Sequence, residues 1–215
     1  MINVVIAFDD KDAALGKYFE DCQEDIFFIL EDQSVFINSC FRVSQLKCNV
    51  SYIDTVISQL NCDPFIFIAY THGIANGLRC NENSFVSVAN GHHFSNSLFY
   101  STACHIGKSL APELIKKGCK AFIGFKEASS VIFKNANYRK IFLECDNFAL
   151  KMFLTVPNTS IKQAFDAMKN YYTTKIDYLR DVLEDPIVAG YLLANREALI
   201  CLGNENLKKE DLFLS

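Results

Sequence analysis

The chain has 215 residues, half of them hydrophobic and 13% aromatic, which is enough to bury the core of one sizeable domain, and we expect a single domain over residues 1–215. The same composition excludes an intrinsically disordered chain. A formal net charge of −4 lacks the basic field that direct binding to nucleic acid requires, so that partner class is excluded too.

The apolar runs, the N-terminus and the cysteines indicate in which part of the cell we expect the protein. No apolar run reaches the ~18 residues needed to span a bilayer, so we expect no membrane segment. Residues 1–10 lack the basic region and cleavage site of a signal peptide and are typical of a first strand instead. The nine cysteines are odd in number and show no C-x-x-C spacing, which predicts reduced thiols in the cytoplasm and no structural zinc.

The N-terminal part of the chain alternates apolar runs with helical spacing. Residues 2–8 predict a buried strand, and residues 11–21 predict a helix. Residues 26–30 form a second apolar run, whereas the pattern over 31–49 is mixed. Apolar residues three, four and seven apart predict an amphipathic helix over 52–60, which Pro64 prevents from continuing.

Two strands in the middle of the chain are apolar on both faces, which is typical of central parallel strands covered by helices. They run over 65–70 and from Ser97 toward Cys104. Between them, residues 85–88 suit a short strand, and Asn90-Gly91 is a hairpin signal.

The next segment predicts a helix and a further buried strand. Pro112 is tolerated only in a first turn, so the helix starts near Ser109, and Gly118 is placed to cap its C-terminus. The strand follows at 121–125.

The C-terminal third is predominantly helical. A helix is expected over 138–154, and Ser160 with Gln163 forms a capping box that opens a long helix. Asp185-Pro186 opens another, and 198–202 suits a last strand. We therefore expect an α/β fold with a mainly parallel central sheet, helices on both faces, and the C-terminal helices over one side.

Candidate chemistry lies where two of these strands end. His72-Gly73 follows the strand at 65–70, and Cys104 ends the strand that begins at Ser97. Carboxyl ends of parallel strands meet at one edge of a sheet, so a Cys104 thiolate would lie beside the His72 imidazole and the N-terminus of the following helix. The backbone N–H groups of Gly73 and Cys104 are candidates for an oxyanion hole. The alternative, a buried thiol and a strand-end histidine without a chemical role, stays open.

The same residues carry a family resemblance. Tyr70-Thr-His72-Gly73 and Thr102-Ala-Cys104-His-Ile-Gly107 resemble the catalytic signature of the caspase-like cysteine peptidases, and they are most similar to the prokaryotic CHAT-domain group. They are less similar to metacaspases, although Cys-His-x-Gly is also their pattern. The order of strand, His-Gly, strand, Ala-Cys-x-x-Gly and helix extends the resemblance over roughly residues 2–203.

The resemblance implies a three-layer caspase-like fold and a cysteine endopeptidase, with Cys104 as nucleophile, His72 as general base and acid, and Gly73 and Cys104 supplying the oxyanion-hole N–H groups. It implies no cofactor and no metal. The expected partners are a dedicated protein substrate and an activating or sensor protein, in bacterial antiviral defence or cell death.

Four residues are candidates for the pocket that holds the substrate side chain before the scissile bond (S1). Thr102 stands where metacaspases have an aspartate that binds a basic side chain, which puts strict Arg/Lys specificity in doubt. Asp9 and Asp10 follow the first strand, where related enzymes line S1, although a solvated strand-end turn explains them better. Glu127 lies in the polar loop after the strand at 121–125.

Other histidines and other functions remain as alternatives. His105 is the second candidate base, and His92-His93 is expected in a loop, without further ligands for a metal. A catalytically silent caspase-like interaction module would keep the same fold. A Rossmann-like nucleotide-binding protein would need G-x-G-x-x-G or a P-loop, and the sequence has neither.

Overall fold

The structure is a computed structural model that describes residues 1–60, 63–81, 83–132 and 135–213. Its centre is a sheet with the strand order β2-β1-β3-β7-β8-β9. The first five strands in this order are parallel, and β9 pairs antiparallel with β8. The bounds of these strands are β1 (Ile2–Phe8), β2 (Ile37–Ser44), β3 (Phe65–Tyr70), β7 (Ser97–Ser101), β8 (Ala121–Phe125) and β9 (Leu199–Gly203).

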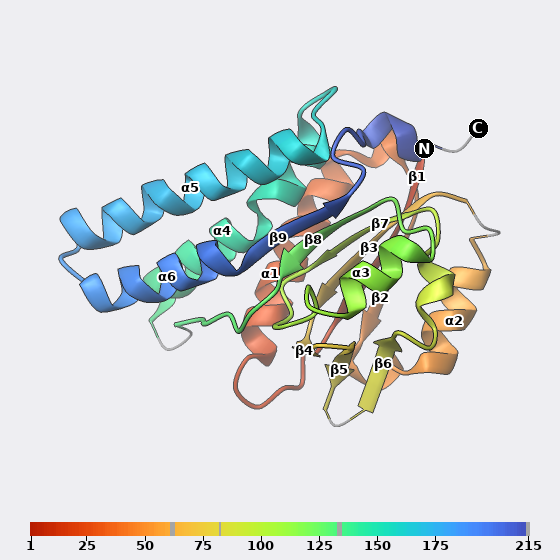
Figure 1. Cartoon of the computed structure of the whole chain (residues 1–215), viewed down its shortest axis with the longest axis horizontal. Helices are drawn as coiled ribbons and strands as arrows, with labels where there is room; N and C mark the ends of the chain where they lie inside the picture. The colour runs from red at the N-terminus through yellow and green to blue at the C-terminus, as the bar shows by residue number, and fades with distance from the viewer. Residues whose placement is uncertain (61–62, 82, 133–134, 214–215) are drawn as a thin grey trace.

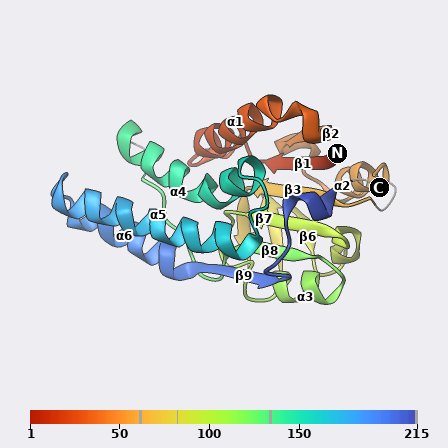
Figure 2. The ribbon, with the colours of Figure 1, turned by 90° about the horizontal axis from the view of Figure 1, so that it is seen from above.

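Helices cover both faces of this sheet, which makes three layers (Figures 1 and 2). One face carries four helices: α1 (Gly16–Asp32), α4 (Ala136–Thr155), α5 (Ile161–Asp181) and α6 (Pro186–Ala198). The other carries α2 (Val50–Ser58), α3 (Leu110–Lys116) and a small antiparallel sheet of β4 (His72–Ile74), β5 (Gly77–Cys80) and β6 (Asn83–Ser87). The α/β fold predicted from the strand–helix alternation is confirmed, including the C-terminal helices over one side.

The two layers of core follow from the alternation of side chains along each buried strand. In β3, Ile66 and Ile68 point into the core under α1 and α4, while Phe65 and Phe67 point into the core under α2 and α3. All residues of β3 are buried, because a strand with apolar residues on both faces is stable only between two covering layers.

Several local predictions are confirmed with their physical reason. The capping box of Ser160 and Gln163 is formed in both directions at the start of α5. Gly118 follows α3 with a φ of +98°, the left-handed conformation that favours glycine after a helix. Within the described residues, no helix combines the length and the apolar character needed to cross a membrane.

Other local predictions are wrong. The first helix begins at Gly16, not Lys11, because the Asp12 carboxylate accepts the N–H groups of Ala14 and Leu15 and holds the preceding residues in a turn. That helix runs to Asp32 and so includes the apolar run at 26–30.

The mixed region contains a strand, and the predicted hairpin is wrong. β2 lies within 31–49 and pairs with β1. Asn90-Gly91 does not turn a hairpin; instead it opens a short 3-10 helix over Gly91–Phe94, and β7 pairs with β3 instead of β6.

Candidate active site

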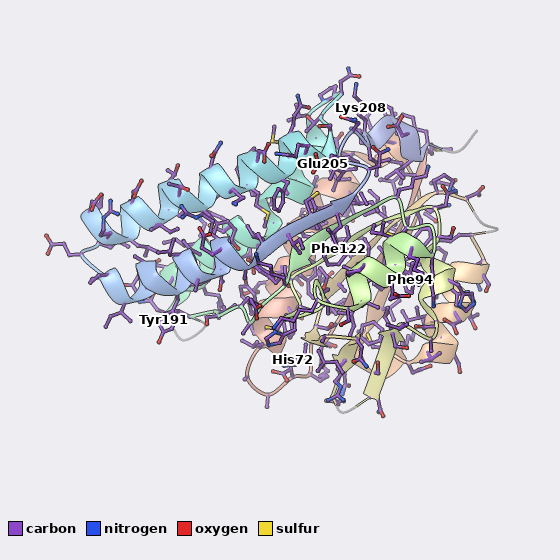
Figure 3. All side chains as sticks on the ribbon, viewed as in Figure 1. His72, Phe94, Phe122, Tyr191, Glu205 and Lys208 are labelled. Atoms are coloured by element: carbon purple, nitrogen blue, oxygen red, sulfur yellow. The ribbon has the colours of Figure 1, made fainter. Side chains whose placement is uncertain are left out.

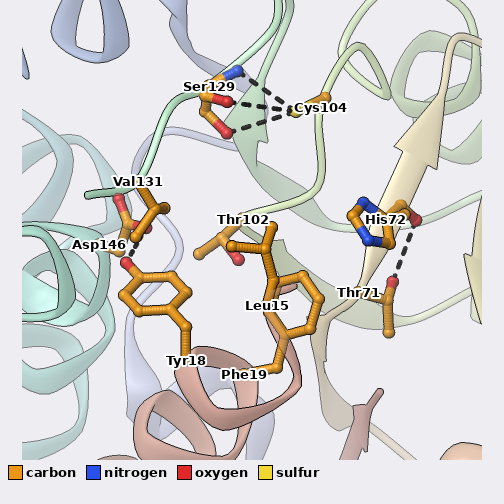
Figure 4. Close-up of a pocket in the computed structure, with 10 residues that line it drawn as sticks. All are labelled: Leu15, Tyr18, Phe19, Thr71, His72, Thr102, Cys104, Ser129, Val131 and Asp146. Carbon is orange, nitrogen blue, oxygen red and sulfur yellow. Dashed lines mark hydrogen bonds between the residues drawn. The ribbon is translucent and has the colours of Figure 1, made fainter. Parts of the chain in front are cut away.

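His72 and Cys104 leave the sheet from neighbouring strands. β3 and β7 are parallel and in register from Phe65↔Ser97 to Ala69↔Ser101. Both chains therefore reach the same edge of the sheet, where His72 and Cys104 line one pocket (Figure 4). The juxtaposition expected from the two strand ends is present.

The two turns that carry these residues touch directly. A Cβ atom at Gly73 would lie 2.4 Å from the Cys104 carbonyl oxygen and 2.8 Å from the Ala103 Cβ. Only glycine permits this approach, so Gly73 lets strand β4, which carries His72, pack against the turn that carries Cys104.

The His72 ring is held by a carboxylate that the sequence analysis did not single out. Its Nε2 lies 3.0 Å from Oδ2 of Asp12, and its ring meets that of Phe19 edge-on at 5.5 Å. Burial opposes ionisation of Asp12, but the N–H groups of Leu15 and Ala14 and the His72 ring outweigh it and lower the pKa of Asp12 below its ordinary 3.8.

This hydrogen bond fixes the tautomer of the histidine. An ionised carboxylate can only accept hydrogen bonds, so the proton sits on Nε2 of His72. The lone pair of the neutral ring is then on Nδ1, which is left to take a proton from a nearby group. Asp12 therefore contacts and orients the His72 ring.

The Cys104 thiol contacts the loop between β8 and α4. The Ser129 N–H donates to Sγ at 3.3 Å, and the hydroxyl and carbonyl oxygens of Ser129 lie 3.4 and 3.7 Å from it. Among the described residues, the hydrogen bonds of this thiol go to Ser129 and not to His72.

The same loop is hydrogen-bonded to α6. Ser130 donates its N–H to Oδ1 of Asn195 and accepts from its Nδ2, both at 2.8 Å. Asn195 is fully buried, so its two hydrogen bonds fix the backbone next to Ser129, the residue that contacts the Cys104 thiol.

The pocket beside Cys104 is lined by both apolar and polar side chains (Figure 4). Leu15, Phe19 and Val131 supply apolar walls. The polar lining includes Asp146, whose Oδ2 accepts from the Tyr18 hydroxyl at 2.6 Å and whose Oδ1 accepts from Tyr172 at 2.5 Å. Burial raises the pKa of Asp146 to about 6 despite these two bonds.

The four residues considered for the S1 pocket lie in different places. Thr102 lines the pocket, and its Oγ1 is buried without a hydrogen-bond partner among the described residues. Asp9 is fully buried and accepts the Asn81 N–H at 3.2 Å, and burial raises its pKa.

The other two S1 candidates bond away from the pocket. Asp10 accepts the Gln45 N–H at 3.2 Å and pairs with Lys11, and the exposed Glu127 pairs with Lys108 at 2.7 Å. Of the four, therefore, the structure brings Thr102 to the pocket that His72 and Cys104 share.

The helix after Cys104 lies further along the chain than expected. α3 begins at Leu110, whose N–H bonds the Ala75 carbonyl, and the N–H of Ala111 bonds the Ile106 carbonyl. These N–H groups are therefore not directed at the thiol, because the turns between Cys104 and Leu110 separate the two.

The other histidines lie outside this pocket. His105 has a φ of +64°, and its Nδ1 faces Glu127 at 3.8 Å. His92 and His93 stack at 4.0 Å and line a separate pocket near Phe65, at the opposite end of β3. In the described part of the chain, no three His, Cys, Asp or Glu side chains are grouped to hold a metal ion.

No family model matches this sequence, and a search of curated proteins finds none that is similar to it. A function for this protein is therefore inferred from the residues of this site.

Proposed function

We propose that the protein is a cysteine endopeptidase with Cys104 as nucleophile and His72 as general base and acid. The observation that supports this most strongly is that both residues line one pocket at the ends of adjacent parallel strands, with Asp12 holding the His72 ring in the tautomer a base needs.

The proposed reaction proceeds through an acyl-enzyme. Nδ1 of His72 takes the Cys104 proton, and the thiolate attacks the carbonyl carbon of the scissile peptide bond. The oxyanion of the tetrahedral intermediate is bound by the N–H groups of Gly73 and Cys104. The C–N bond then breaks, His72 protonates the leaving amine, and water activated by His72 hydrolyses the thioester and regenerates the thiol.

The substrate in this proposal is a protein segment whose side chain enters the pocket beside Cys104. Ser129 moves off the thiol as that segment binds, because its three atoms occupy the approach to Sγ. An activating or sensor protein would act at this step. A reducing compartment such as the cytoplasm keeps the nucleophile in its thiol form.

A second function, a catalytically silent interaction module of the same fold, is favoured by one observation. The hydrogen bonds of the Cys104 thiol go to Ser129, whereas His72 bonds Asp12. A module without activity would keep this arrangement when a peptide binds.

Thiol reactivity separates the two functions before any substrate is known. We would treat the chain with limiting iodoacetamide at about pH 7.5 and map the modified cysteines by mass spectrometry, because at that pH unperturbed thiols (pKa ~8.5) are mostly protonated. Cys40 and Cys201 are partly exposed competitors, but burial raises their pKa to about 11 and about 12. The peptidase predicts preferential alkylation of Cys104, lost in His72→Ala and retained in Cys40→Ala; alkylation of Cys104 that is unchanged in His72→Ala favours the silent module.

Activity is then tested with a fluorogenic peptide library diversified at the residue before the scissile bond, under reducing conditions. Cleavage by the wild type that disappears in Cys104→Ala and in His72→Ala supports the mechanism. Cleavage that survives in Cys104→Ala contradicts it.

A further inference from the structure

The two helices of the α5–α6 hairpin present very different surfaces to solvent. The exposed side of α5 carries ion pairs such as Lys162–Asp166 and Arg180–Asp177, as expected of a solvated helix. In contrast, α6 has no charged residue between Pro186 and Asn195. Its exposed positions there are apolar or small: Pro186, Ile187, Gly190, Tyr191, Leu193 and Ala194.

The exposure on α6 is large. Ile187 is 71% exposed, Tyr191 43% and Leu193 40%, and Tyr191 projects from the outer side of α6 (Figure 3). Six of the thirteen exposed large hydrophobic residues in the described chain lie within 178–193, including Val182 and Leu183 at the hairpin turn. A contiguous apolar patch of this kind marks a surface that a partner covers.

Gly190 lies at the centre of the α6 face. Apart from its chain neighbours and the nearby backbone of α6 itself, no atom of the described chain lies within 4 Å of the position that its Cβ would occupy. A glycine inside a helix destabilises that helix relative to alanine, and packing within the described chain gives no reason for Gly190. A backbone that approaches α6 closely from outside would give one.

We propose that this face binds α6 of a second copy of the chain, antiparallel, about a two-fold axis between Gly190 and Tyr191. Such a contact is isologous, so each residue meets its counterpart in exchanged order. Ile187 then packs against the partner's Ala194, and Tyr191 packs over the partner's Gly190. Each large side chain meets a small one, as interdigitation of two helix surfaces requires.

The charges at the two ends of α6 complement each other in this orientation. Before the helix, the acidic residues Asp177, Asp181, Glu184 and Asp185 outnumber Arg180, which pairs with two of them. In its last turn, Arg196 pairs with Glu197. Arg196 is the main reason that the pKa of the Glu197 carboxyl is lowered. Lys169 and Lys126 lower it further, so both lie near this end of α6. An antiparallel pair brings the acidic end of each copy to the basic end of the other, while a parallel pair would bring like charges together. This self-complementarity favours a second copy over an unrelated partner.

The test is the oligomeric state of the full chain by sedimentation velocity, from about 1 to about 300 µM, because one helix face and a hairpin turn bury less than the ~1,600 Å² of a standard interface. We expect a concentration-dependent monomer–dimer equilibrium. Ile187→Asp abolishes the dimer, and the matched control Leu46→Asp, at a residue that is 87% exposed on another surface, retains it. Far-UV circular dichroism checks folding, and Tyr191→Glu is the second variant if Ile187→Asp fails to fold.

A size exchange tests the predicted register. Ile187→Ala leaves two small residues facing each other and weakens dimerisation about tenfold, the effect of losing part of one buried side chain. Adding Ala194→Ile restores the large–small pairing and with it the affinity. A wild type that stays monomeric over the whole range, a dimer unaffected by Ile187→Asp, or a double variant no tighter than Ile187→Ala overturns the proposal. None of these outcomes depends on peptidase activity.

Discussion

Gly73 lies so close to Cys104 that a Cβ atom at position 73 would approach the Cys104 carbonyl oxygen to 2.4 Å. The neighbouring atom is backbone and cannot rotate away, so a side chain at 73 would push the nucleophile out of place. We expect Gly73→Ala to lower kcat/KM by about 100-fold, the scale of effect that an ångström of misplacement produces.

The matched control is Gly190→Ala in α6, where the added Cβ meets no atom of the described chain. This variant should keep activity and gain about 0.5–1 kcal/mol of unfolding free energy in dilute solution. Peptide cleavage and urea unfolding of both variants check the pair; wild-type activity in Gly73→Ala would contradict the close packing of the two turns.

Asp12→Asn tests the positioning of the base. The asparagine amide can donate to Nε2 of His72, which places the ring proton on Nδ1, and it cannot stabilise the imidazolium formed during the reaction. We expect kcat to fall by on the order of 100-fold or more, with KM nearly unchanged. Asp54→Asn is the control, because Asp54 pairs with His93 outside the pocket at 3.6 Å. Equal kinetics of the two variants would remove Asp12 from the mechanism.

Asp146 should make stability depend on pH. Its pKa is raised to about 6 by burial, above the ~3.9 of an unfolded aspartate, so the folded state binds the extra proton between these values. The unfolding free energy should therefore fall as pH rises from about 4 to about 6, by roughly 3 kcal/mol from this group. Asp146→Asn removes this contribution, because an amide does not titrate.

Urea unfolding of wild type and Asp146→Asn at several pH values from 4 to 7 measures the contribution of Asp146 to the unfolding free energy. Only the difference between the two proteins is informative, since other groups titrate in both. A pH-independent difference would show that Asp146 is already ionised at the low end of the range.

The two hydrogen bonds of Asn195 predict the accessibility of the nucleophile. Asn195→Ala leaves the Ser130 N–H and carbonyl without their partners, which destabilises the fold by about 2 kcal/mol and frees the segment that covers Cys104. Alkylation of Cys104 should become severalfold faster. Asn170→Ala, on the exposed side of α5, is the control, and unchanged alkylation in Asn195→Ala would mean that Ser129 does not shield the thiol.

The local sequence pattern was sufficient to predict many of the strands and helices of this molecule. The apolar runs at 65–70 and 121–125 and the capping box at Ser160 each specify their element through nearby residues alone. Because parallel strands end at the same edge of a sheet, the sequence also predicted that Cys104 and His72 lie close together. This prediction did not require their contacts to be known.

The partners of these two residues were decided by tertiary structure. Asp12 is 60 residues from His72, Ser129 is 25 from Cys104, and Asn195 is 65 from Ser130. Each lies in a loop or on a helix whose position depends on packing against the sheet, and side chains so far apart in sequence leave no periodic signal. The sequence therefore determined which strand ends carry Cys104 and His72, whereas only the packing of α1, α4 and α6 decided what orients, covers and surrounds them.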